Sequence, residues 1–274
     1  MSTLKTSEFK RIAEFAQEHW GLHITDVKRE LVTARLTKFL RKSSYASMNA
    51  YLDHMESHAS KDDLLALFDV LSTNMTSFFR ERQHFDYLER EFYTPLARGN
   101  LTLPGKKIRI WSAACSTGPE AYSLAINAME HLPNLQNWDF KILATDLSTS
   151  VLKQAEAGVY PASEVSEMPK AMVSKYFQRG TGASADQVRV APSLRELVTV
   201  RQLNLMESWP FRGPFDIIFC RNVMIYFDKP TRTRLMRRMI DMLRPGGVLA
   251  VGSAETLGNL DLPLRVVQPS VYVK

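Results

Sequence analysis

Cysteine is scarce in this 274-residue chain, which has only Cys115 and Cys220. So sparse a pair excludes a disulfide-rich secreted scaffold and favours reduced thiols in a cytosol. No apolar run approaches the ~18 residues of a membrane span, and the N-terminus lacks the continuous apolar segment of a secretory signal. We therefore expect a cytoplasmic protein that does not insert into a membrane.

The sequence also lacks the common phosphate-binding motifs. It has neither G-x-x-x-x-G-K-[ST] nor G-x-G-x-x-G, yet a small-residue turn, "ACSTGPEA" (residues 114–121), follows the strand-like run "KIRIWSA". Glu120 places a carboxylate where a phosphate would be repelled. The turn is therefore expected to hold a neutral or cationic ligand, and we expect no metal site.

The organisation of the chain changes near residue 100. Residues 1–83 predict consecutive helices and an all-helical N-terminal domain. Residues 84–107 include the Pro- and Gly-containing stretch "YTPLARGNLTLPGKK", which predicts a linker. Residues 108–274 alternate strand-like and helical patterns, so we expect an α/β domain with a doubly wound, mainly parallel, Rossmann-like sheet. The terminal "LRVVQPSVYVK" predicts one antiparallel edge strand.

One segment interrupts this alternation. Residues 158–197 contain "GTGASAD" between two short strand-like pieces, which indicates a hairpin in a small antiparallel β-subdomain. A surface loop and a binding element are both open at this point.

Polar residues stand where the predicted parallel strands end, which is where such sheets bind ligands. Asp146 ends the run "FKILATD" and could accept both hydroxyls of a ribose, whereas Glu120 suits a cation. A nucleoside without phosphates, such as S-adenosylmethionine, satisfies both. The structural alternatives are that Glu120 only places an acid in the first turn of a helix and that Asp146 is only a cap.

The net charge of +6 is unevenly distributed. Residues 1–98 carry 14 basic and 14 acidic residues, and the remainder carries 21 and 15. Within the first part, residues 26–42 ("DVKRELVTARLTKFLRK") predict a basic amphipathic helix with Lys28, Arg35, Lys38 and Lys42 on one face. This face is either a solvated surface or a docking surface for an acidic partner.

Four segments resemble CheR-type chemoreceptor methyltransferases: "LSTNMTSFFRE", "WSAACSTGPEAYSLA", "ILATDLSTSVLKQAEAGVY" and the run that begins "FDIIFCRNVMIYF". The resemblance covers nearly the whole chain. It implies transfer of a methyl group from S-adenosyl-L-methionine to receptor glutamates, giving methyl esters and S-adenosyl-L-homocysteine, for adaptation in bacterial chemotaxis. No general base is needed, because a glutamate of pKa about 4.3 is already ionised at neutral pH.

The resemblance also implies roles for individual residues. Arg80 would orient the substrate carboxylate, and Tyr226 would form a hydrogen bond beside the methyl group. Many members read G-E-E-P-Y where this chain reads "GPEAY", so Pro119 replaces the first acid and Glu120 keeps the second. The implied cofactor-binding residues are Asn74, Thr76, Arg80, Glu120, Asp146, Asn204, Leu205, Arg221 and Asn222.

Several partners follow from the same resemblance. The basic helix would contact the acidic methylation helices of the receptor, and the β-subdomain would bind a C-terminal receptor peptide. A regulatory adaptor protein is a further candidate partner, and we expect a monomer.

Other interpretations of these residues and of the function stay open. Phe78 and Phe79 could be core residues beside a surface Arg80, and Tyr226 could be a core aromatic. The chain could be a binding module with a vestigial site. A nucleic-acid methyltransferase would explain the basic charge, but "CRNVMIYF" stands where an N-P-P-Y-type turn would be expected, so we expect no nucleic-acid partner.

Overall fold

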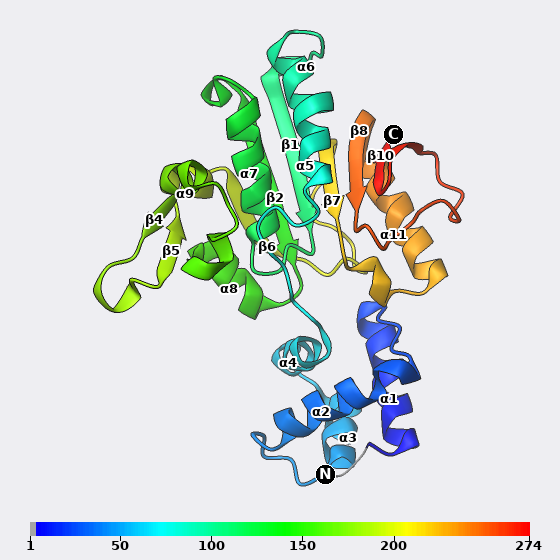
Figure 1. Cartoon of the computed structure of the whole chain (residues 1–274). Coiled ribbons are helices and arrows are strands. Elements are labelled where there is room, and N and C mark those ends of the chain that lie inside the picture. The colour runs from blue at the N-terminus through cyan, green and yellow to red at the C-terminus, as the bar shows by residue number, and fades with distance from the viewer. Residues whose placement is uncertain (1–3) are drawn as a thin grey trace.

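The computed structural model describes residues 4–274 and contains a helical N-terminal part beneath a larger α/β part (Figure 1). The N-terminal helices bury one apolar face each, which brings Ile12, Leu36, Leu52 and Leu67 together. The prediction of an all-helical N-terminal domain is confirmed. Its elements are α1 (Thr6–Trp20), η1 (Asp26–Lys28), α2 (Arg29–Leu40), α3 (Met48–His58) and α4 (Lys61–Leu71).

Arg35 does not join the basic face that the helical pattern of residues 26–42 predicts, whether as a solvated surface or as a docking surface. Its Nη1 donates to the carbonyl oxygens of Ser72 (2.6 Å) and Leu71 (3.2 Å), and its Nη2 donates to Thr73 Oγ1 at 2.9 Å. The last carbonyls of a helix have no partner within the helix, and the planar guanidinium can satisfy several of them at once. Arg35 therefore closes the end of α4, whereas Lys38 stays exposed.

After α4, the structure differs from the helices predicted up to residue 83 and from the linker predicted for residues 84–107. Residues 72–82 form an irregular loop in which Phe79 and Glu81 have φ values of 50° and 57°. Residues 83–97, which overlap the expected linker of residues 84–107, are helical. They comprise α5 (Gln83–Leu88), the π-helix η2 (Glu89–Tyr93) and α6 (Thr94–Ala97).

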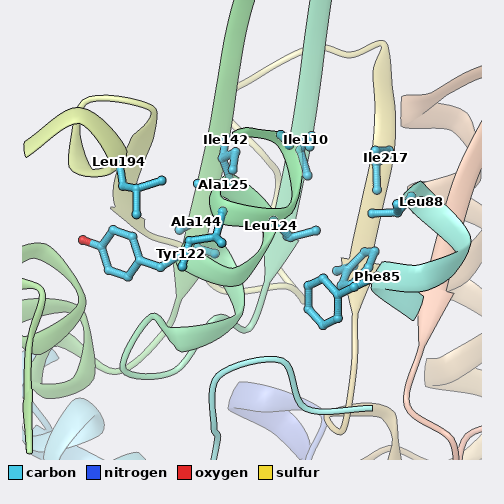
Figure 2. Packing of buried hydrophobic residues seen from close by; sticks show 14 of the residues in the cluster. Phe85, Leu88, Ile110, Tyr122, Leu124, Ala125, Ile142, Ala144, Leu194 and Ile217 are labelled. Atoms are coloured by element: carbon cyan, nitrogen blue, oxygen red, sulfur yellow. The ribbon is translucent and has the colours of Figure 1, made fainter. Parts of the chain in front are cut away.

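This helical segment belongs to the core of the α/β part. Phe85, Leu88 and Tyr93 are buried, and Figure 2 shows Phe85 and Leu88 pointing toward the strand that carries Ile217. Their spacing buries one face of the segment against the sheet. The Pro and Gly content predicts a linker here, but the buried apolar face makes the segment part of the core. Between the end of α6 at residue 97 and the first strand at residue 107, the only helical element is the short η3 (Pro104–Lys106).

A seven-stranded sheet forms the centre of the larger part, in the order β6-β2-β1-β7-β8-β10-β9. The first five strands in this order run parallel, which confirms the doubly wound, mainly parallel fold. The strands are β1 (Lys107–Ala113), β2 (Asp139–Asp146), β6 (Val198–Gln202), β7 (Phe215–Cys220), β8 (Leu243–Val251), β9 (Arg265–Gln268) and β10 (Val271–Val273).

The C-terminal segment forms two strands, so the prediction of one antiparallel edge strand is wrong. β10 pairs antiparallel with β8, and β9 pairs antiparallel with β10 and occupies the edge. The turn at residues 269–270 folds the segment back on itself, with Ser270 at a φ of 61°. The apolar side chains of β10 are thereby buried between two neighbours, with Val271 at 1% exposure.

Helices cover both faces of the sheet. On one face lie residues 83–97 and α7 (Pro119–His131), whose Tyr122 and Leu124 point into the cluster of Figure 2. On the other face, α11 (Lys229–Met242) packs in a cluster that also contains Trp20 and Trp111. The N-terminal helices therefore share one core with the sheet. The remaining helical elements are α8 (Thr149–Ala157), η4 (Leu135–Asn137), η5 (Ala162–Val165), α9 (Lys170–Tyr176), η6 (Gly182–Ser184), α10 (Pro192–Arg195) and η7 (Met224–Tyr226).

A second, three-stranded sheet projects to one side of the molecule (Figure 1). It contains β3 (Val159–Pro161), β4 (Phe177–Arg179) and β5 (Gln187–Val190) in the order β3-β5-β4, all antiparallel. This confirms the predicted small antiparallel subdomain. Gly180 begins the turn between β4 and β5, where a Cβ atom would stand 2.0 Å from the Ser184 carbonyl oxygen.

None of the helices within residues 4–274 is long and apolar enough to cross a bilayer.

The closure of α4 by Arg35 predicts a stability effect. Arg35→Ala should destabilise the protein by about 1.5–3 kcal/mol, because charged hydrogen bonds to helix-end carbonyls are lost. Thermal unfolding measures it, with Lys38→Ala as the matched control that should change stability by less than about 0.5 kcal/mol. Equal unfolding temperatures for the two variants would contradict the role given to Arg35.

Candidate functional site

A cavity of about 290 Å³ lies where the parallel strands end and the N-terminal part begins. β1 stands between β2 and β7, so the chain connections leave it in opposite directions and open a crevice at the strand ends. The loop of residues 72–77 and the start of α2 close the cavity from the other side. All ten residues that the sequence predicts for the site line it: Asn74, Thr76, Arg80, Glu120, Asp146, Asn204, Leu205, Arg221, Asn222 and Tyr226.

Asp146 ends β2 and is held by backbone donors. The N–H of Ser116 donates to its Oδ2 at 2.9 Å, and the N–H of Ser148 donates to its Oδ1 at 3.0 Å. Burial raises the pKa of Asp146, and these N–H groups oppose that rise. The N–H of Leu147 is a third donor, and a carboxylate can accept about four hydrogen bonds, so Asp146 can still accept a hydroxyl hydrogen from a ligand. It is therefore both a cap for the turns and a potential ribose ligand.

Glu120 lies in the first turn of α7, at the base of the cavity. Ser112 Oγ donates to its Oε1 at 2.6 Å, and Arg221 Nη1 donates to its Oε2 at 3.2 Å. Burial raises the pKa of Glu120, whereas the positive charge of Arg221 lowers it. The preceding turn needs glycine, because Gly118 has a φ of 99° and a Cβ there would meet Ala155 Cβ at 2.9 Å. Pro119 fits the first helical position, where no N–H is needed.

Arg221 follows β7 and is buried between two carboxylates. Besides Glu120, it contacts Glu81, whose Oε2 accepts from Nη2 at 2.9 Å and from Nε at 3.3 Å. Burial alone would raise the pKa of Glu81, but Arg221 and neighbouring donors bring it below the usual range. Glu81 is not among the residues that the sequence predicts for the site, although it stands next to Arg80 in the segment "LSTNMTSFFRE".

Glu255 is a second residue of the site that is not predicted from the sequence. Its carboxylate accepts from the backbone N–H groups of Asn222 (2.8 Å), Gly252 (2.7 Å) and Ile225 (3.1 Å). Asn222 is in the left-handed region with a φ of 58°. Glu255 thus fixes the turn that carries Asn222 and Tyr226. Its position after β8 gave no sequence signal, because the contact joins residues 33 apart.

The mouth of the cavity carries two partly exposed cations and one aromatic ring. Arg80 Nη1 donates to the carbonyl oxygen of Met75 at 3.0 Å. Lys28 Nζ lies 4.5 Å from the centre of the Tyr226 ring, and burial lowers the pKa of Lys28. Lys28 therefore lines the cavity, rather than only a surface of the helix. Exposed Met75 also lines the cavity.

Phe78 and Phe79, next to Arg80, pack in the core, which agrees with the interpretation of this pair as core residues. Phe78 contacts Tyr160 and Phe177 edge-on, and Phe79 contacts Phe85. The pair lies in the irregular loop, and its burial fixes the backbone on which Arg80 stands. The same segment therefore contributes both to the core and to the position of Arg80 in the site.

Asn204 and Leu205 line the cavity, and Asn204 contacts the end of α1. Asn204 Nδ2 donates to Glu207 Oε1 at 3.0 Å and to the carbonyl oxygen of His19 at 3.3 Å, and its Oδ1 accepts from the N–H of Met206. Leu205 is buried. The Asn204 amide is thus already occupied in joining the two parts of the chain.

The polar side chains of the cavity fit a nucleoside that carries positive charge. Two buried carboxylates, Glu120 and Asp146, line the interior, and neither turn exposes the run of free N–H groups that a phosphate requires. A sulfonium and an ammonium group would suit Glu120, and ribose hydroxyls would suit Asp146. S-adenosylmethionine has all of these groups.

Comparison with known proteins gives the same result. The family description "CheR methyltransferase, SAM binding domain" matches residues 74–273, and "CheR methyltransferase, all-alpha domain" matches residues 7–72. This chain belongs to the CheR methyltransferase family. The boundary between the two matches falls in the irregular loop that closes the cavity. The cofactor of this CheR-family methyltransferase is S-adenosylmethionine.

Three relatives show how far the similarity extends. "Chemotaxis protein methyltransferase 2" of Pseudomonas aeruginosa is 41% identical over 97% of this chain and 92% of its own length. The "Chemotaxis protein methyltransferase" of Borreliella burgdorferi is 36% identical, covering 97% and 94%. That of Escherichia coli is 35% identical, covering 98% and 91%. The chain is therefore similar to these proteins in both of its parts.

The buried carboxylates predict how the cofactor is held. Glu120→Ala should weaken S-adenosylmethionine binding by about 1.5–3 kcal/mol, because a charged hydrogen-bond acceptor is lost from the base of the cavity. Wild-type affinity should also fall as the pH is lowered, starting above the usual carboxyl range, because burial raises the pKa of Glu120 and only the ionised form attracts a cation. Calorimetry across pH 8 to 5 measures both effects. Exposed Glu167→Ala is the control, and wild-type affinity in Glu120→Ala would refute the assignment.

Proposed function

We propose that this CheR-family protein methylates the γ-carboxylate of glutamate side chains in membrane chemoreceptors, forming glutamyl methyl esters and S-adenosylhomocysteine in the cytoplasm. The observation that carries the proposal is that two partly exposed cations, Arg80 and Lys28, line the same cavity as Tyr226 and the buried carboxylates. A carboxylate substrate complements those cations. The printed names of the relatives, chemotaxis protein methyltransferases, support a receptor of the chemotaxis system as its source.

The chain's own residues would bring this reaction about by orientation. When bound, the cofactor supplies a methyl group on a positively charged sulfur. A glutamate is ionised at neutral pH, so the protein has to align its oxygen rather than remove a proton. Arg80, tied to Met75, would hold the carboxylate and favour its charged form. The Tyr226 hydroxyl, on the turn fixed by Glu255, would donate a hydrogen bond beside the methyl group.

Labelled methyl transfer tests the proposed substrate. Incubating the protein with methyl-labelled S-adenosylmethionine and chemoreceptor-containing membranes should label the receptor, and mild base should release the label as methanol, because a glutamyl ester is hydrolysed where an N-methyl group is not. Label that resists base, or that appears on added nucleic acid, would contradict the proposal.

The same assay tests the role of Tyr226. Tyr226→Phe should lower turnover by about tenfold while S-adenosylmethionine affinity stays within about twofold, because the hydroxyl is assigned to the reaction and not to cofactor binding. Tyr45→Phe, in the N-terminal part, is the matched control. Full turnover in Tyr226→Phe would remove the hydroxyl from the mechanism.

The small sheet supports a second contact with the receptor. β4 is an edge strand whose Gln178 and Arg179 are exposed, and residues 180–186 extend beyond it as an exposed turn. An edge strand can pair with an extended peptide through main-chain hydrogen bonds. We propose that it binds a C-terminal receptor peptide, with exposed Lys38 and Lys42 contacting the acidic methylation helices separately. A regulatory adaptor and a monomeric state stay predictions.

Shortening the hairpin tests the tether. Replacing residues 180–186 by Asn-Gly keeps a two-residue turn but removes the extension of the β4 edge, so it should abolish binding of a receptor C-terminal peptide. S-adenosylmethionine affinity should not change, because the cavity lies elsewhere. Calorimetry with the peptide and with the cofactor measures both. Unchanged peptide affinity would make residues 180–186 a surface loop without this role.

A further inference from the structure

Glu81 reaches the cofactor cavity through Arg221 and Asn222, which both line it and donate to the Glu81 carboxylate. Glu81 is absent from the cavity lining, whereas Arg221 and Glu120 are both part of it. The Glu81 side chain is 16% exposed, and that of Arg221 is 2% exposed. A carboxylate in this position changes the charge of the cavity wall without contacting the ligand.

The chain adopts an uncommon backbone conformation to bring this carboxylate into place. Glu81 has a φ of 57°, a left-handed conformation that few residues other than glycine adopt. Its Oε1 accepts from the backbone N–H of Ser253 at 3.2 Å, and its Oε2 accepts from Arg221. These contacts hold the carboxylate at the guanidinium.

The buried cluster then carries a net charge. Arg221 contributes one positive charge, and Glu81 and Glu120 contribute one negative charge each. His84 Nδ1 lies 3.6 Å from Glu81, but burial lowers the pKa of His84 to about 4, so this ring is neutral at pH 7. The sum is one negative charge. Without Glu81, Arg221 would neutralise Glu120 and the cluster would be neutral.

We propose that Glu81 is a positioning residue that keeps the base of the cavity negative by neutralising Arg221, and so favours the positively charged sulfonium of S-adenosylmethionine over the neutral thioether of S-adenosylhomocysteine. The two ligands share ribose, adenine and amino-acid groups, so their difference in affinity reports the charge around the sulfur. Charges interact strongly over a few ångströms in a partly buried site. The proposal concerns the cofactor site alone and does not depend on the acceptor named under the proposed function.

Calorimetric titration of both ligands tests this, without any acceptor present. Glu81→Gln keeps the shape and removes the charge, so the ratio of the S-adenosylmethionine Kd to the S-adenosylhomocysteine Kd should rise by about tenfold. Glu81→Asp keeps the charge and should leave the ratio within about twofold of wild type, even if both affinities fall. Glu91→Gln, an exposed carboxylate paired with Arg90, is the matched control and should change neither Kd.

A role in packing alone would weaken both ligands by the same factor. An unchanged ratio in Glu81→Gln therefore overturns the proposal, whatever happens to the individual Kd values. If circular dichroism shows that Glu81→Gln does not fold, Glu81→Ser, which also removes the charge, is measured in its place. A ratio that rises by about tenfold there supports the proposal, and an unchanged ratio overturns it. Methyl transfer to receptors is measured separately, so failure of the proposed substrate leaves this result standing.

Discussion

The buried guanidinium of Arg221 joins three parts of the chain beside the cavity. It projects from the end of β7, pairs with Glu120 at the start of α7 and pairs with Glu81 in the loop that leaves the N-terminal part. Removing a charge from water costs several kcal/mol, and a buried charge is stable only when partners satisfy it. The strand end, the helix start and the loop must therefore hold one relative position for Arg221 to be accommodated.

The same constraint positions the rest of the site. Glu81 Oε1 accepts from Ser253 after β8, and the nearby Glu255 carboxylate holds the turn of Asn222 and Tyr226 through three backbone N–H groups. The cavity wall is thus built from carboxylates that accept backbone and side-chain donors. Such a wall can bind a cationic nucleoside, and it disfavours a phosphate. The chemistry of the ligand follows from how the strand ends are held.

The N-terminal part completes the cavity because it shares a core with the sheet. Trp20 and Leu36 belong to the same buried cluster as Trp111 on β1 and Met236 on α11. Leu22 forms a bridge with Phe227, and the N–H of His23 donates to the carbonyl oxygen of Tyr226. A mouth made from both parts can present Lys28 and Tyr226 to a substrate together. Neither part contains the site by itself.

Sequence patterns alone determined the all-helical first part, the mainly parallel sheet and the small antiparallel subdomain, and the resemblance to CheR-type methyltransferases implied ten of the residues that line the cavity. These depend on local periodicity, on residues at strand ends and on motifs whose members are close in the chain. Only the tertiary structure decided that residues 83–97 are core helix, that the C-terminus forms two strands, and that Arg35 closes α4 rather than facing solvent. It also decided that Lys28, Glu81 and Glu255 belong to the site. Their partners are up to 198 residues away, as for Lys28 and Tyr226, and no local pattern encodes which distant charge or carbonyl a side chain will meet.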